Sequence, residues 1–143
     1  MREYRFAEFL TESFSALHRE LPDVHARMCR LLCPREVHLD VGGEGVSLRF
    51  DDDAAVFLEG PLCPAIHVST SRVAILALVD ARSTLIEAVM SDELSLVGTP
   101  VDLLRFHDGL MTYLHGAVRA PSFPDLLRRF RQPALLMRED KTF

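Results

Sequence analysis

Apolar residues recur at helical spacing near the start of the chain. Steps of four and three separate the members of one stripe, which are Leu10, Phe14, Leu17, Leu21, Val24, Met28 and Leu31. Such steps place side chains on one face of a helix. Pro22 interrupts the stripe, and proline is tolerated in the first turn of a helix but not in its interior. We therefore expect two helices that face a core, with a short coiled-coil seam of a homodimer as the alternative.

The period changes to two after Pro34. Apolar and polar residues alternate in three successive segments, at residues 37–41, 46–50 and 54–59. A glycine-rich turn at 42–45 and three aspartates at 51–53 separate these segments. The pattern is typical of antiparallel strands with one face in the core, and a fourth strand is expected at 65–69.

Helical spacing then returns. One apolar face is formed by Val73, Leu76 and Val79, and another by Leu85, Ile86, Val89 and Met90. A last short strand is expected at 94–98. It leads into Thr99-Pro100-Val101-Asp102, where an N-cap threonine, a proline and an acid predict the start of a long helix. Ser122 and Asp125 repeat this arrangement before a final helix.

Composition and charge limit the classes of function. The chain has 143 residues, is 48% hydrophobic and carries a net charge of −5, so we expect no nucleic-acid partner. Residues 119–143 carry a balance of +3, which leaves −8 on the rest. We predict a single domain, with N-terminal helices at 1–34, a core at 35–118 and a C-terminal helix and tail at 119–143.

The expected compartment is the cytoplasm. No apolar run approaches the ~20 residues needed to cross a bilayer, and the N-terminus lacks the apolar stretch of a signal peptide. The three cysteines are an odd number, which argues against a disulfide framework.

Patterns that carry catalytic chemistry are absent from the sequence. There is no GxSxG, HExxH or GxxxxGK[ST] motif. The glycines at 42–45 predict a hairpin, because Glu44 would repel a bound phosphate. His107 and Asp108 are adjacent on a helix, which predicts side chains on different faces and no dyad. We therefore expect no catalytic residue, no cofactor and a protein that is not an enzyme.

One set of residues has the spacing of metal ligands. His25, Cys29 and Cys33 follow one another at steps of four on the second expected helix. Cys33 directly precedes Pro34, however, and buried cysteine is a common small core residue. We therefore predict no metal site.

The order of elements carries a resemblance to a known family. Ile66-His67-Val68-Ser69-Thr70-Ser71 leads into an apolar helix, and Met90-Ser91-Asp92-Glu93-Leu94-Ser95-Leu96-Val97-Gly98 forms a turn and a strand that ends in glycine. A long helix with Asp102, Leu103, Leu104 and Phe106 follows. From Val37 to Leu114 this order resembles the sterol carrier protein type 2 (SCP2) domain. The family usually has glycine where this chain has Asp80-Ala81-Arg82-Ser83, and again where it has Ser91.

The resemblance implies an α+β fold and a binding function. It implies a mixed, mostly antiparallel sheet of about five strands with helices packed on one face, and an apolar tunnel between these layers. The expected function is non-enzymatic binding or transfer of a lipid or another long apolar small molecule. The alternative is an accessory module with a reduced tunnel, which docks an enzyme of lipid or quinone metabolism.

Two sets of residues are predicted to serve this function. The apolar helix faces predict a pocket lined by Leu76, Val79, Ile86, Val89, Met90, Phe106, Leu110 and Leu114. In the C-terminal helix, an apolar face is flanked by arginines, and the residues concerned are Phe123, Leu126, Leu127, Phe130, Arg128, Arg129 and Arg131. This helix is expected to be either a lid or a surface that docks on an anionic membrane or an acidic protein partner.

Overall fold

Two helices open the chain in the computed structural model, which describes residues 4–140 and the side chains of residues 4–131. Helix α1 spans Phe6–Glu20 and helix α2 spans Pro22–Leu32, so the predicted break at Pro22 is confirmed. Most of the predicted stripe is buried, and its other members are half-buried. The stripe therefore packs in the core of its own chain.

A five-stranded sheet forms the second layer, with strand order β3-β2-β1-β4-β5. The strands are β1 (Glu36–Val41), β2 (Glu44–Phe50), β3 (Ala55–Leu58), β4 (Ile66–Thr70) and β5 (Ser95–Val97). Strands β1 and β4 are parallel, and the other neighbouring pairs are antiparallel. The predicted α+β fold with a mixed, mostly antiparallel sheet is confirmed.

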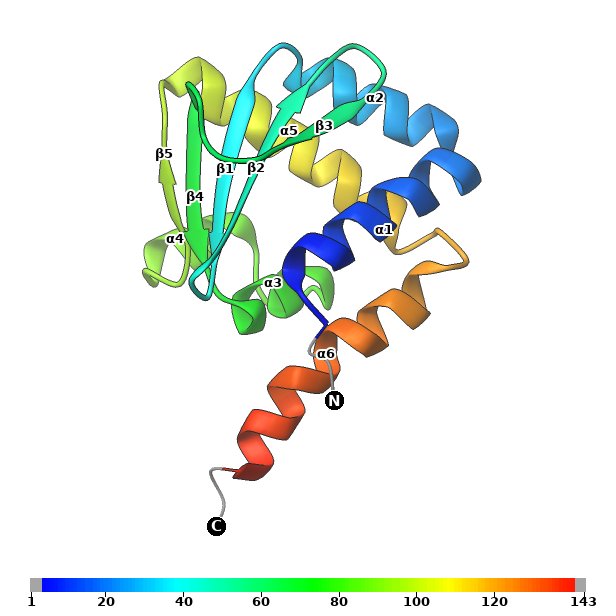
Figure 1. Cartoon of the computed structure of the whole chain (residues 1–143). Coiled ribbons are helices and arrows are strands. Elements are labelled where there is room, and N and C mark those ends of the chain that lie inside the picture. The colour runs from blue at the N-terminus through cyan, green and yellow to red at the C-terminus, as the bar shows by residue number, and fades with distance from the viewer. Residues whose placement is uncertain (1–3, 141–143) are drawn as a thin grey trace.

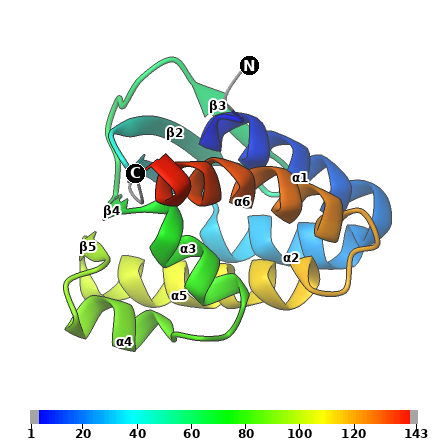
Figure 2. The same ribbon diagram turned by 90° about the horizontal axis from the view of Figure 1, so that it is seen from below.

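Four further helices are described after the first two. They are α3 (Arg72–Val79), α4 (Leu85–Met90), α5 (Pro100–Ala117) and α6 (Phe123–Asp140). Helices α1, α2 and α5 lie against one face of the sheet, as Figure 1 shows. Seen from below, α6 runs alongside α1, with α3 on its other side (Figure 2). No helix within residues 4–140 is both long enough and apolar enough to cross a bilayer.

Side-chain caps fix where several of these helices begin. The Thr99 hydroxyl accepts a hydrogen bond from the amide of Asp102 at 3.2 Å, which confirms the predicted start of α5. Ser122, at the start of α6, donates its hydroxyl proton to the carboxylate of Glu20 in α1. The predicted start of the final helix is confirmed, since α6 begins directly after Ser122 and has Asp125 in its first turn. In addition, Ser122 joins the start of α6 to the end of α1.

Two loops hold non-glycine residues in the left-handed region of φ. Ala81, between α3 and α4, has φ of 59°, and Asp92, before β5, has φ of 62°. Ala81 lies within residues 80–83, where the resemblance implies a glycine. The other position at which it implies a glycine, Ser91, has φ of −92°, and the left-handed residue is its neighbour Asp92. Both loops therefore have a glycine-type backbone, although neither Ala81 nor Asp92 is glycine.

Candidate functional site: an apolar cavity between sheet and helices

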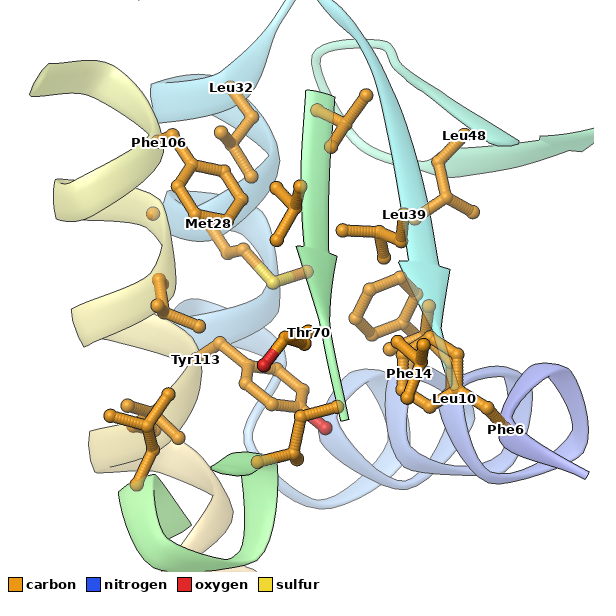
Figure 3. Close-up of a pocket in the computed structure, with 18 of the residues that line it drawn as sticks. Phe6, Leu10, Phe14, Met28, Leu32, Leu39, Leu48, Thr70, Phe106 and Tyr113 are labelled. Carbon is orange, nitrogen blue, oxygen red and sulfur yellow. The ribbon is translucent and has the colours of Figure 1, made fainter. Parts of the chain in front are cut away.

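A cavity of about 130 Å³ lies between the helix-facing side of the sheet and the helices (Figure 3). Helices α1 and α2 contribute Phe6, Phe9, Leu10, Phe14, Met28 and Leu32 to its wall. The strands contribute Val37, Leu39, Val41, Leu48, Phe50, Val68 and Thr70. The wall is completed by Ile75, Leu78, Val79, Leu94, Phe106, Gly109, Leu110, Tyr113 and Leu114.

Strand register explains why the sheet side of this wall is apolar. Leu39 of β1 pairs with Val68 of the parallel strand β4, and Val37 of β1 pairs with Leu48 of the antiparallel strand β2. Side chains at paired positions point to the same face of a sheet. The predicted alternation therefore places one continuous apolar row opposite the helices.

The polar side chains at the wall are engaged with other parts of the protein. Among the wall residues that the structure describes, Thr70 and Tyr113 alone carry a hydroxyl. Thr70 donates to the carbonyl of Glu93 at 2.9 Å. Tyr113 donates to Ser13 at 2.9 Å, and Ser13 in turn donates to the carbonyl of Leu10 at 2.9 Å. Burial raises the pKa of Tyr113, so its hydroxyl stays protonated at neutral pH.

Aromatic rings back the α1 side of the cavity. Phe9 stacks on Phe130 of α6 with ring centroids 4.3 Å apart and meets Phe123 edge-on at 5.9 Å. Phe14 meets Tyr113 edge-on at 5.7 Å. Helix α6 thus contributes no described residue to the wall. It packs against α1, whose own side chains line the cavity.

A carboxylate in the β1–β2 hairpin holds the start of α1. Glu44 accepts hydrogen bonds from the amides of Phe6 at 3.0 Å and Ala7 at 2.9 Å. The guanidinium of Arg72 lies 3.6 Å from Glu44, donates to the carbonyl of Tyr4 at 2.5 Å and lies 4.7 Å from the ring centroid of Phe130. The predicted hairpin is confirmed, but the part that Glu44 plays was not predicted.

The structure brings half of the predicted pocket residues into the wall. Those in the wall are Val79, Phe106, Leu110 and Leu114. Leu76 is buried in the core but does not reach the cavity. Ile86, Val89 and Met90 lie outside it and are 70%, 37% and 80% exposed. Helix α4 has only six residues and buries Leu85 and Ala88, which turns these three side chains to solvent.

The wall residues of α1, α2 and the strands were missed by sequence reasoning. Their periodicity was recognised, but it indicates only that a side chain faces inward, not whether the space in front of it is filled. The family resemblance began at Val37 and did not include the first two helices. The three phenylalanines within the first 14 residues, Phe6, Phe9 and Phe14, were the one available signal.

The C-terminal residues predicted as a lid or docking surface pack on the rest of the chain. Phe123 and Phe130 are buried and Leu127 is half-buried. Their flanking arginines meet acids of the same chain. Arg128 pairs with Asp125, Arg129 with Glu12 at 2.9 Å, and Arg131 with Asp80 at 2.9 and 3.0 Å. The hydrogen bond from Arg131 lowers the pKa of Asp80.

The residues with metal-ligand spacing do not form a cluster. The Sγ of Cys29 lies 4.0 Å from Nε2 of His25, whereas the thiol of Cys33 donates to Asp52 at 3.4 Å. Burial raises the pKa of Cys29 to about 11 and lowers the pKa of His25. Within the described part of the chain, no three His, Cys, Asp or Glu side chains are placed to hold a metal ion.

One expectation about neighbouring polar residues is wrong. His107 and Asp108 are in contact, with Nδ1 of the histidine 3.3 Å from Oδ1 of the aspartate. Half-exposed side chains at adjacent helix positions can still turn toward each other at the surface, even though their Cβ atoms point to different faces. Both side chains are more than 40% exposed and neither lines the cavity.

Comparisons with known proteins identify the fold. No protein-family model and no curated protein matches the sequence. A structure described as "UbiJ-SCP2 Ubiquinone synthesis protein" is 19% identical with a TM-score of 0.57, and the match covers 80% of this chain and 96% of that one. A conserved hypothetical protein from Thermus thermophilus, described as possibly a sterol carrier protein, is 16% identical with a TM-score of 0.53, over 86% of this chain and 94% of that one.

A named sterol carrier protein is also similar. Apo sterol carrier protein 2 from Yarrowia lipolytica is 13% identical with a TM-score of 0.50, and the match covers 71% of this chain and 88% of that one. At these identities the similarity concerns the fold alone. The chain therefore has an SCP2-like fold, as its order of elements predicted.

Proposed function

From the SCP2-like fold and the cavity chemistry, we propose that this protein binds a lipid or another long apolar small molecule without catalysing a reaction. The observation that carries the proposal is a cavity walled by apolar side chains, whose two hydroxyl groups are engaged elsewhere. Such a site gives a ligand no anchor other than removal of its hydrocarbon surface from water. Each buried methylene then contributes about 0.8 kcal/mol.

The size of the cavity sets a condition on this function. A cavity of about 150 Å³ in another protein accommodates one benzene ring, and the cavity here is about 130 Å³. A long chain therefore requires a wall to move. We propose that α1 is the part of the wall that moves and that α6 moves with it, because α6 packs on α1 through Phe9 and Phe130. The pairing of Arg128, Arg129 and Arg131 within the chain favours a lid over a membrane-docking surface.

A second candidate function follows from the same small volume. An accessory module that docks an enzyme of lipid or quinone metabolism needs no open tunnel. One protein with this fold is described as a ubiquinone synthesis protein. In this case the cavity is only a space that the core side chains leave unfilled, and the surface that binds the enzyme lies elsewhere on the molecule.

Native mass spectrometry with solvent extraction, applied to the protein as expressed, distinguishes the two functions. A lipid carrier is expected to retain an extractable apolar molecule and to bind a fluorescent fatty acid. Leu39→Trp fills the cavity and is expected to weaken the binding of this probe at least tenfold. Ile86→Trp introduces the same side chain on the exposed face of α4 and should leave binding unchanged. A ligand-free mass together with no probe binding by the wild-type protein would favour the docking module.

A further inference from the structure

A second hollow, a groove of about 550 Å³, lies between α2 and α5. Its lining consists of Asp23, Val24, Arg27 and Leu31 from α2, Asp108, Met111, Thr112 and His115 from α5, and Arg119 just beyond α5. None of these described residues also lines the cavity. The groove therefore lies on the side of the two helices that the cavity does not reach.

The two helices that form the groove lie side by side (Figure 2). Gly116 of α5 lies beside Val24, near the start of α2, and Gly109 lies beside the last residue of α2. The helices are therefore antiparallel, and the groove runs along both. At 1.5 Å per residue, the segments 23–31 and 108–119 are about 12 and 16 Å long, which matches two to three turns of a further helix.

Apolar side chains from both helices line part of this α2–α5 groove. Val24, Leu31 and Met111 are half-buried, so part of each side chain still meets water. A partner that covers these side chains removes this remaining apolar surface from water. Methionine is flexible and adapts to an irregular partner surface. The apolar part of the groove thus suits the apolar stripe of an amphipathic helix.

Arginines that have no carboxylate partner gather around the groove. Most arginines whose side chains the structure describes form an ion pair. The exceptions are Arg5, Arg27, Arg30, Arg105 and Arg119, and all but Arg5 lie on α2, on α5 or directly after it. These four side chains are exposed. Although the net charge of the chain is −5, this face carries positive charge that the rest of the described chain does not neutralise.

The two carboxylates in the groove are compensated within the chain. Asp23 lies in the first turn of α2, where the positive end of the helix dipole stabilises a negative charge. Asp108 lies 3.3 Å from the ring nitrogen of His107. Because the helices are antiparallel, these acids lie at opposite ends of the groove. A partner helix can place each of its charges separately, whereas a flat anionic membrane would bring phosphates against both acids. The arrangement therefore favours a protein helix.

We propose that the α2–α5 groove binds an acidic amphipathic helix of a partner protein. Apolar residues at helical spacing in the partner pack on the apolar side chains of the groove, and flanking carboxylates face Arg27 and Arg119. Arg30 and Arg105 extend the basic surface and attract the acidic helix before contact. This interaction goes beyond the proposed ligand binding, because it uses a face that the cavity does not reach. It also supplies the surface that a docking module needs.

A library of displayed helical peptides of about 15 residues tests the proposal. Selection runs in parallel on the wild-type protein and on the double variant Arg27→Glu with Arg119→Glu. Peptides enriched on the wild type are expected to carry acidic residues beside an apolar stripe of helical spacing. They should bind the double variant at least about fivefold more weakly, because two exposed ion pairs are replaced by repulsion. Fluorescence anisotropy measures these affinities.

Two controls show whether the groove itself is responsible. Arg5→Glu with Arg82→Glu makes the same change in net charge at exposed positions outside the groove, and it should leave peptide binding unchanged. Selected peptides in which lysine replaces each acid should not bind the wild-type protein. This second control gives a result even if a variant does not fold.

Several results would overturn the proposal. One is that no peptide prefers the wild type to the groove variant, and another is that the enriched peptides lack acidic residues. Binding to phosphatidylglycerol vesicles that the groove variant loses, without peptide binding, would identify a membrane surface instead. A dimer that the groove variant loses, measured by light scattering, would identify a second copy of this chain as the occupant. Binding of a fluorescent fatty acid in the cavity is measured separately, so failure of either function leaves the other standing.

Discussion

Single residues in the two glycine-type loops carry backbone strain. Ala81 and Asp92 occupy the left-handed region, which costs a non-glycine residue roughly 1–2 kcal/mol. Glycine relieves this cost but has more freedom to lose on folding, which takes back roughly 0.5–1 kcal/mol. The net effect of glycine at such a position is therefore a small gain in stability.

Ala81→Gly is expected to raise the free energy of unfolding by up to about 1 kcal/mol. Chemical denaturation monitored by circular dichroism measures the change. Ala77→Gly, four residues earlier within α3, is the matched control. It should lower the free energy of unfolding by about 1 kcal/mol, because glycine is unfavourable inside a helix. A loss of stability in Ala81→Gly would show that the left-handed backbone at this position is not strained.

At the level of elements, close packing of α2 against α5 depends on two glycines. A Cβ atom on Gly109 would lie 2.7 Å from the side chain of Leu32, and one on Gly116 would lie 2.5 Å from Val24. Distances this short are not compatible with an unmoved neighbour. The glycines of α5 thus allow α2 to lie close enough to contribute Met28 to the cavity wall.

Gly109→Ala is expected to destabilise the protein by up to about 2 kcal/mol. Overpacking costs about 1–3 kcal/mol, and the better helix propensity of alanine returns at most about 1 kcal/mol. The matched test is the double variant Gly109→Ala with Leu32→Ala, which makes room for the new methyl group. The double variant should lose less free energy of unfolding than the two single variants lose together. Additive losses in urea denaturation would mean that Gly109 and Leu32 are not in tight contact.

Helices and strands could be predicted from the sequence where the apolar pattern was long, or where capping residues or a proline marked the start of a helix. The break at Pro22 and the start of α5 at Thr99 are examples. The orientation of α4 could not be predicted, because a helix of six residues makes less than two turns and four of its residues are large and apolar. The small Ala88 faces the core there, while Met90 faces solvent. From size and hydrophobicity alone, Met90 would be expected to face the core and Ala88 to face solvent.

The cavity was predictable only in outline for a related reason. Val79, Phe106, Leu110 and Leu114 were identified because they lie on regular helices within the region of family resemblance. Phe6 and Phe14 were not, since a sequence pattern does not reveal where packing is incomplete. Long-range contacts such as the one between Glu44 and the start of α1 span 37 and 38 residues and leave no local signal.

For the molecule as a whole, the proposed binding of a long ligand is expected to depend on how firmly α1 is held. Glu44 and Arg72 connect the β1–β2 hairpin, the start of α1, α3 and α6 at one place. Since α1 carries part of the cavity wall, this network resists the movement that would widen the cavity. The stability of one local contact and the exchange rate of the ligand are therefore expected to change together.

Glu44→Ala tests this coupling. It leaves the first amides of α1 without their acceptor, which is expected to cost about 1–2 kcal/mol. If this lost free energy makes local unfolding of α1 easier, hydrogen exchange in α1 and release of a bound fluorescent fatty acid should both accelerate roughly 5- to 30-fold. Hydrogen exchange measured by mass spectrometry and stopped-flow displacement of the probe give these rates.

Glu36→Ala provides the control, because it removes a carboxylate that also accepts from two backbone amides, but outside α1. Glu36 accepts from the amides of Leu62 at 2.8 Å and Cys63 at 3.0 Å, in the loop between β3 and β4. Its loss should lower global stability without a selective effect on α1 or on probe release. Equal acceleration of release in both variants would mean that ligand exchange follows global unfolding. Faster release in Glu44→Ala alone would identify α1 as the wall that moves.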